Sequence, residues 1–506
     1  MFFLLQFDFL AQPVKAAVFN PAKAPGSHIP RLLQQFKNLG LNTIFVEAQQ
    51  QDFDVTAHAL TVQWCRQLAL KIVYRPGPFV STFLPLGGVS GALFEGRAIQ
   101  RRFDNPEFAQ NAQDFIAHIS AFLVENRDDI AAVQLDKNYF AQPGQAGFYE
   151  YLRMLYVRNG VYGPFIVQED TEVEGLMGVS YIVSDASLCG ESCFVGDILT
   201  GSQGTVVRKS SKTAYFNVIQ DLIKSNSSFV LYGVYTGVNF KLDKQIQSPQ
   251  INDFSQLIFA NNKLSEDYFN LQEILGGLNS EESGEFDLQN FSSYLVNFGA
   301  LRYQEFIKKG TFYNAISSES VDLKQNINKY TFRIEKNVLA TLKVSQVNKN
   351  AQLYVNDTYL ASFNKEIEIT ISSEDGIIQI VTFPAGYDNQ PNSGMTGKIE
   401  FNSQEVHHIT LETLDMFNYT LKESKADFWS GDGVYSSKIS LQKKGFYVNL
   451  FGVKGYFLIN GVMIGFSDGD KLYCPEDFVL EGVNEIIVIA LENQFTLSIA
   501  LLSELI

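Results

Sequence analysis

The chain has 506 residues, of which 46% are hydrophobic and 13% aromatic, so it can bury the cores of two or three domains and is not disordered. Its formal net charge of −16 and its isoelectric point near 4.9 repel phosphate backbones, and no cluster of lysine and arginine offsets this locally. The composition therefore excludes nucleic acid as a partner.

The first residues bear on the compartment. Residues Met1–Leu10 are mostly apolar but lack a basic start and include Asp8, so they do not make a convincing signal peptide. No stretch approaches the roughly 18–20 apolar residues of a transmembrane helix. We expect an intracellular protein without a transmembrane segment, with a lumenal or secreted location left open.

Short apolar runs alternate with amphipathic helices through the first half of the chain, a pattern typical of parallel β/α units. Eight strands are predicted, at Val14–Phe19, Thr43–Glu47, Lys71–Tyr74, Ala131–Leu135, Phe165–Gln168, Tyr181–Val183, Phe194–Asp197 and Phe229–Val234. Helices are predicted between them, at Pro30–Asn38, His58–Leu68, Pro106–Glu125, Gly147–Arg158 and Thr213–Ser225. Residues 1–280 are therefore expected to form a (β/α)8 TIM barrel, whose functional groups lie at the C-terminal ends of the strands.

The rest of the chain changes from α/β to β texture. Residues 281–325, which begin in an acidic stretch rich in serine and glycine, are predicted to be a linker and mixed segment. Short alternating strands are then predicted at Tyr330–Glu335, Ala351–Val355, Glu366–Ile371, Ile377–Thr382, Phe446–Leu450, Gly455–Ile459 and Asn484–Ala490. We expect a middle β-sandwich at residues 326–405 and a C-terminal jelly roll at residues 406–506.

The cysteines do not indicate a metal or a disulfide scaffold, because the chain has only 4 of them. Cys189 and Cys193 could pair locally in an oxidising compartment, and the sequence leaves their state open. Without further cysteine or histidine nearby, their spacing is a weak metal signal. We expect no metal site and no cofactor.

Ordered motifs along nearly the whole chain carry a resemblance to a known family. Val133–Tyr139 reads Val-Gln-Leu-Asp-Lys-Asn-Tyr and resembles the Val-Gln-Val-Glu-Asn-Glu-Tyr signature of family 35 glycoside hydrolases, the β-galactosidases. Other segments similar to this family are His28–Arg31, Gly40–Ile44, Arg75–Phe79, Asp104–Phe108, Ser265–Leu271, Ala351–Asn356 and Glu481–Ile486. Each motif is weak alone, but their order favours the family's fold, a barrel followed by β domains.

The resemblance implies a retaining glycosidase with two catalytic carboxyl groups roughly 5–5.5 Å apart. The family's acid/base Glu corresponds to Asn138, whose carboxamide cannot deliver a proton to the departing sugar oxygen. The family's nucleophile, a Glu at the end of strand seven, corresponds to Asp197, which is one methylene shorter. A shift of about 1 Å can cost roughly a hundredfold in rate, and losing the acid costs about 10²–10⁴. We predict little hydrolysis of an ordinary galactoside.

The positions that hold the sugar in the family have also changed. Glu47 stands where the family has the Tyr of a strand-two loop, and Phe83 stands where it has a Glu that grips galactose hydroxyls. Lys137 replaces the Asn before the acid/base, and Ile246 replaces a Tyr. Hydroxyls left unpaired against Phe or Ile cost roughly 1–3 kcal/mol each. The galactose site is therefore predicted to be dismantled, although Lys137 could lower the pKa of neighbouring carboxyl groups.

We interpret the chain as a catalytically inactive homologue of family 35 that serves as a structural or interaction subunit and binds other proteins in an assembly. One alternative is an active retaining β-galactosidase or exoglycosidase of altered specificity, with a carboxylate pair rebuilt from Glu47, Asp136 and Asp197. Another is a non-catalytic carbohydrate-binding protein, which the presence of only 2 tryptophans disfavours. A galactoside is not the favoured ligand.

Overall fold

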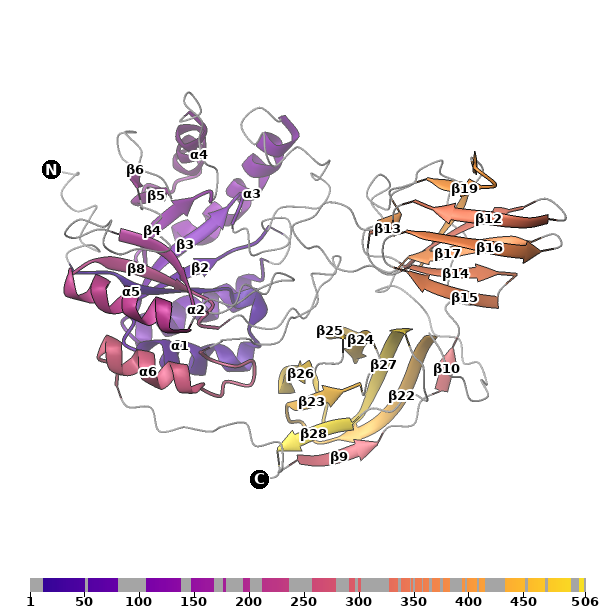
Figure 1. Cartoon of the computed structure of the whole chain (residues 1–506). Coiled ribbons are helices and arrows are strands. Elements are labelled where there is room, and N and C mark those ends of the chain that lie inside the picture. Colours follow the sequence, from indigo (N-terminus) through magenta and orange to yellow (C-terminus); the bar gives the residue numbers. More distant parts are fainter. Residues whose placement is uncertain are drawn as a thin grey trace.

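The computed structural model falls into three groups of elements, an α/β group and two β groups (Figure 1). It describes residues 12–50, 53–80, 106–137, 147–167, 176–178, 194–200, 212–235, 257–278, 291–295, 299–301, 327–334, 338–345, 347–348, 351–356, 358–363, 366–373, 376–382, 394–395, 398–406, 409–414, 433–450, 454–468, 472–492 and 500–504.

The α/β group is built on one curled parallel sheet of eight strands, in the order β6-β5-β4-β3-β2-β1-β8-β7. The strands are β1 (Lys15–Phe19), β2 (Thr43–Glu47), β3 (Lys71–Gly77), β4 (Ile130–Leu135), β5 (Phe165–Val167), β6 (Leu176–Gly178), β7 (Phe194–Leu199) and β8 (Ser228–Tyr232). This half-barrel is consistent with the TIM-like domain predicted from the sequence. The expected strand at Tyr181–Val183 lies outside the described residues. Leu176–Gly178 is the sixth strand in chain order and lies at the edge of the sheet beside β5.

Helices cover this sheet: α1 (Ile29–Asn38), α2 (Val55–Gln67), α3 (Pro106–Glu125), α4 (Gly147–Arg158), α5 (Lys212–Lys224) and α6 (Glu266–Leu275). One apolar layer lies between helices and sheet and includes Phe36 and Ile44, whereas a second layer inside the curl includes Phe45 and Val73. Burial on both faces explains why the strands read as nearly continuous apolar runs. Helix α6 ends at Leu275 and is capped by Gly276, whose φ of +68° suits a glycine.

The middle β group is a sandwich with its own buried core. Its larger sheet has the order β15-β14-β17-β11-β21 and its smaller sheet the order β16-β12-β19-β20, with β13 and β18 paired beside them. The strands are β11 (Ile327–Arg333), β12 (Val338–Val344), β13 (Val347–Asn348), β14 (Ala351–Val355), β15 (Thr358–Phe363), β16 (Ile367–Ser373), β17 (Ile377–Thr382), β18 (Gly394–Met395), β19 (Ile399–Phe401), β20 (Gln404–Glu405) and β21 (Thr410–Leu414).

The last β group also has two sheets and a core, and it is called here the C-terminal β domain. Its sheets have the orders β10-β22-β27-β24-β25 and β26-β23-β28-β9. The strands are β9 (Phe291–Leu295), β10 (Gly299–Leu301), β22 (Gly433–Leu441), β23 (Phe446–Asn449), β24 (Lys454–Ile459), β25 (Val462–Asp468), β26 (Leu472–Cys474), β27 (Gly482–Glu492) and β28 (Ala500–Glu504).

The C-terminal β domain is assembled from two separated parts of the chain. Strands β9 and β10 come from the segment predicted as a linker, yet they pair with β28 and β22. Conversely, β21 lies beyond the expected boundary at residue 405 but pairs with β11 in the middle sandwich. The middle sandwich is therefore inserted between strands of the C-terminal β domain. The predicted boundaries differ from the observed strand pairing because the domain boundaries depend on pairing between distant strands.

The described residues bear on the state of the cysteines and on the presence of a transmembrane helix. Cys65 and Cys474 are buried free thiols, whereas Cys189 and Cys193 lie outside the described residues. Among the described helices, none is long and apolar enough to cross a membrane.

Candidate functional site

A buried group of charged side chains lies at the C-terminal edge of the parallel sheet. Glu47 is the last residue of β2, Arg75 lies in β3, Lys137 follows β4 and Asp197 lies in β7. Parallel strands place their C-terminal ends at one edge, which brings these four residues together. Glu47 and Arg75 are also direct partners in the register of β2 and β3.

Asp197 is held by two cations. Arg75 Nη2 donates to Asp197 Oδ1 at 2.7 Å and Arg75 Nη1 donates to Oδ2 at 3.3 Å, while Lys137 Nζ donates to the same Oδ2. The side chains of Arg75, Lys137 and Asp197 are 4%, 2% and 1% exposed. Burial alone would raise the pKa of Asp197, but Arg75 and Lys137 outweigh it and lower this pKa to about 2. Asp197 is therefore an ionised carboxylate with both oxygens engaged.

The two cations are themselves fixed by neighbouring groups. Arg75 Nε donates to Gln134 Oε1 at 2.6 Å, and its guanidinium lies 4.6 Å from the centre of the Phe45 ring. The ammonium of Lys137 lies 4.9 Å from the centre of the Tyr232 ring. Burial lowers the pKa of Lys137, whereas Asp197 raises it. Stacking on aromatic faces and hydrogen bonding compensate part of the cost of burying these charges.

The backbone of β7 directs Asp197 towards these cations. Asp197 has a φ of +44°, in the left-handed region that Asp tolerates better than most residues. The pairing of β7 with β8 shifts register between Val195 and Ile198, which marks a bulge at this point. Bulges next to functional sites redirect a side chain, and here the carboxylate is the one redirected.

Asp136 has a different role from its charged neighbours. Its Oδ1 accepts the backbone N–H of Phe79 at 2.6 Å, and the side chain is buried. This bond holds the turn after β3, where Gly77 has a φ of +84° and a Cβ would lie 2.8 Å from the Phe79 nitrogen. The contact is that of a structural acceptor.

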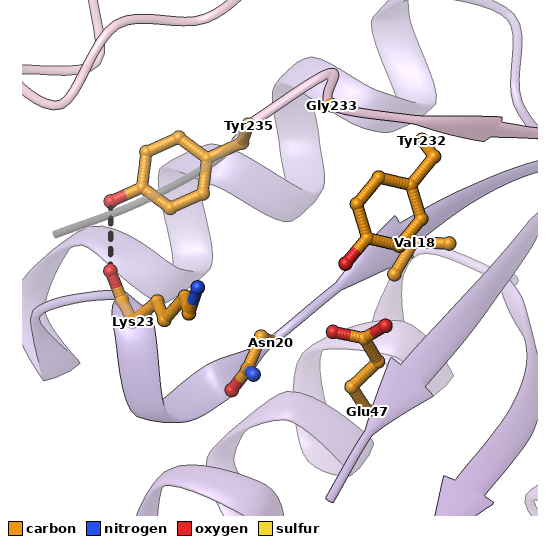
Figure 2. A pocket seen from close by; sticks show the side chains of 7 residues that line it. All are labelled: Val18, Asn20, Lys23, Glu47, Tyr232, Gly233 and Tyr235. Carbon is orange, nitrogen blue, oxygen red and sulfur yellow. Dashed lines mark hydrogen bonds between the residues drawn. The ribbon is translucent and has the colours of Figure 1, made fainter. Parts of the chain in front are cut away.

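Glu47 lines a small open hollow with Val18, Asn20, Lys23, Tyr232, Gly233 and Tyr235 (Figure 2). Burial raises the pKa of Glu47, whereas Lys137 and Arg75 lower it. Within the described structure, Glu47 Oε1 and Asn20 Nδ2 are buried and have no hydrogen-bond partner. Tyr235 donates its hydroxyl to the backbone oxygen of Lys23 at 3.4 Å, which ties one wall of the hollow together.

Three of the predicted site residues therefore meet at one place, Glu47, Lys137 and Asp197. Asn138, Phe83 and Ile246 lie outside the described residues. Sequence reasoning noted Arg75 only as a letter of a family motif and missed its pairing with Asp197. A signal was present, because the predicted second and third strands are neighbours whose ends place an arginine beside Glu47.

No metal centre is evident in the described residues, where no group of three or more histidine, cysteine, aspartate or glutamate side chains could hold an ion. Hydrogen-bonding capacity at the edge comes instead from Glu47, Asn20 and the cations. What the arrangement offers chemically is an ionised carboxylate balanced by two cations and, beside it, a hollow lined by two polar atoms that have no hydrogen-bond partner among the described residues.

Comparison with known proteins supports the resemblance over part of the chain. Residues 10–177 match the family model described as glycosyl hydrolases family 35, which confirms the resemblance there. No curated protein matches the sequence.

Solved structures similar to the chain include a β-glucuronidase of Bacteroides uniformis, with 8% identity, a TM-score of 0.34, and coverage of 98% of this chain and 66% of that one. An endo-β-1,4-mannanase from Thermotoga petrophila has 9% identity, a TM-score of 0.36, and coverage of 79% and 97%. The chain thus spans about two thirds of the glucuronidase, and at TM-scores this low neither similarity supports a conclusion on function.

Proposed function

We propose that this chain is a glycosidase-like protein that no longer hydrolyses galactosides and that acts as a structural or interaction subunit. The observation that carries the loss of activity is the state of Asp197, whose two oxygens are bonded to Arg75 and Lys137 in a buried setting. A nucleophilic carboxylate must present an oxygen to the sugar carbon at about 3–3.5 Å. In this arrangement neither oxygen is presented.

Energetics support the same proposal. A low pKa is compatible with a nucleophile, since it keeps the carboxylate ionised, so the objection lies in the engaged oxygens. Freeing an oxygen of Asp197 for attack requires breaking its buried bonds to Lys137 and Arg75, and breaking a buried ion pair costs about 3–5 kcal/mol. At 1.36 kcal/mol for each factor of ten, that is roughly a 10²–10⁴-fold loss in rate. The replacement of the acid/base by Asn138 adds its own penalty.

The direct test is hydrolysis of two aryl β-galactosides, one with a nitrophenol leaving group and one with a dinitrophenol, which needs no acid catalyst. We expect no turnover above buffer from the wild-type protein with either substrate. Lys137→Asn is the matched variant, because it removes the ammonium and introduces the family's residue. Wild-type turnover that disappears in Asp197→Ala would overturn the proposal.

A second candidate, non-catalytic binding of a carbohydrate, is favoured by one observation at the hollow. Glu47 Oε1 and Asn20 Nδ2 are an acceptor and a donor without partners among the described residues, as a hydroxylated ligand would require. Calorimetric titration with galactose and other monosaccharides tests it. Binding that weakens at least tenfold in Glu47→Gln would support this candidate, and no heat at millimolar sugar would exclude it.

The structural or interaction role has a test of its own. The polypeptide mass is 56.8 kDa. We expect the endogenous protein in a native extract to elute at a clearly larger mass than the purified recombinant chain. Equal elution of the two, at the mass of a single chain, would contradict a role in an assembly.

A further inference from the structure

The connection between β1 and α1 lies against the C-terminal β domain. The backbone N–H of Ser27 donates to Asp477 Oδ2 at 3.1 Å, and the rings of His28 and Tyr473 have centroids 6.0 Å apart. Ala260, in the segment that follows β8, packs against the same Tyr473. Two segments of the α/β group therefore meet one side of β26 and the short turn that follows it (Glu476–Phe478).

His28 is the titratable group at the centre of this contact. It is 9% exposed, and its Nδ1 has no hydrogen-bond partner in the described part of the chain. Burial lowers the pKa of His28. Asp477 and Glu476 from the C-terminal β domain and a hydrogen bond with the Ala260 backbone oppose this, while Arg31 on α1 acts with burial. Overall the pKa of His28 is lowered, so its imidazole is neutral in the docked structure.

We propose that Ser27, His28 and Asp477 form a pH-sensitive clasp between the α/β group and the C-terminal β domain. At neutral pH the uncharged imidazole fits the buried contact beside Tyr473. A proton added at Nδ1 creates a cation that finds no acceptor at this nitrogen among the described residues, whereas the undocked imidazole is solvated. Acid therefore favours undocking.

The clasp continues into the wall of the hollow. The same connection carries Asn20 and Lys23, which line the hollow beside Glu47. Opening of the clasp would release this wall at one end while Tyr235 holds Lys23 at the other. The device does not depend on whether the chain hydrolyses a sugar.

The size of the effect follows from proton linkage. A solvated histidine has a pKa near 6.5, and burial lowers that of His28 from this value. If the docked form stays neutral, a change from about pH 7.5 to about pH 5.5 raises the open population by up to about tenfold. A histidine that titrates equally in both states would give no change.

The amide of Ser27 is a built-in reporter, because its N–H is bonded across the contact. Hydrogen–deuterium exchange of the whole chain is measured by mass spectrometry at the two pH values, with protection at Ser27 corrected for the intrinsic rate. We expect protection to fall several-fold, up to tenfold, at the lower pH, while peptides from β27 keep their protection. Constant protection of Ser27 would overturn the proposal.

Variants separate the clasp from general acid instability. His28→Gln removes the titration and should make protection of Ser27 independent of pH. Asp477→Asn should reduce protection at both pH values, since the acceptor is weakened, and His118→Gln is a matched control that should behave like wild type. Should His28→Gln fail to fold, Asp477→Asn still decides, because unchanged Ser27 protection in that variant would contradict the clasp.

Discussion

Replacing Asp197 with Asn keeps the shape of the side chain and removes the charge that Arg75 and Lys137 share. Burial would raise the pKa of Asp197, yet the two cations lower it from 3.8 to about 2. At 1.36 kcal/mol per unit, this corresponds to about 2 kcal/mol of stability. Leaving the cations buried without their anion costs about 3–5 kcal/mol. We expect Asp197→Asn to lower the free energy of unfolding by about 2–5 kcal/mol.

Urea unfolding at neutral pH measures this loss, and a double-mutant cycle assigns it. Lys137→Met removes one cation, so the double variant should lose less than the sum of the single variants, with a coupling of about 1–3 kcal/mol. Asp129→Asn is the control, because its partner Arg66 is 64% exposed and surface pairs contribute little. A loss in Asp197→Asn as small as that of the control, with no coupling to Lys137, would refute the reasoning.

Three further outcomes are expected. Burial lowers the pKa of His58 to about 3, so wild-type stability should fall as pH drops from about 6.5 towards 3 in acid unfolding titrations, and His58→Gln should flatten that fall. Gly77→Ala forces an L-residue to a φ of +84° and should lower stability by about 1–3 kcal/mol in thermal unfolding. Deleting residues 500–506 removes β28, the strand between β23 and β9, and limited proteolysis should then cleave within 291–295.

The strands of the parallel sheet could be predicted because both of their faces are buried. Thr43–Glu47 is buried at every position, which gives a continuous apolar run that ends in one charged residue. The sixth strand has a weaker signal in the sequence. Leu176–Gly178 is three residues long and contains a glycine, so local preference is weak and its pairing with β5 makes it a strand.

The two-part construction of the C-terminal β domain could not be predicted from local pattern. Phe291–Leu295 reads Phe-Ser-Ser-Tyr-Leu, in which apolar and polar residues do not alternate. Because it also follows an acidic, serine-rich stretch, it resembles a linker. It becomes a strand because its backbone bonds to β28 at Ala500–Glu504. Register between strands this far apart is set by tertiary packing rather than by the sequence near either strand.

At the candidate site, strand order places Glu47, Lys137 and Asp197 at one edge, but which of their side chains pair is set by the tertiary structure. The sequence indicated that Lys137 could lower the pKa of a neighbouring carboxyl group, and Asp197 is the group that has this lowered pKa. The contribution of Arg75 to lowering the pKa of Asp197 depends on the bulge in β7 and on the left-handed φ of Asp197, neither of which has a sequence signature.

The Lys137–Asp197 contact links stability and the proposed loss of activity in one interaction. An amide at position 137 would leave Asp197 Oδ2 with its longer bond from Arg75 Nη1 at 3.3 Å, whereas the ammonium adds a second donor to that oxygen. The ammonium also needs a buried anion, so changing Asp197 leaves two buried cations without the anion that they share, whereas changing Lys137 leaves the carboxylate with Arg75. Any variant designed to restore a nucleophile must therefore remove Lys137. The stability that such a variant loses measures how much the ion pair contributes at this edge of the parallel sheet.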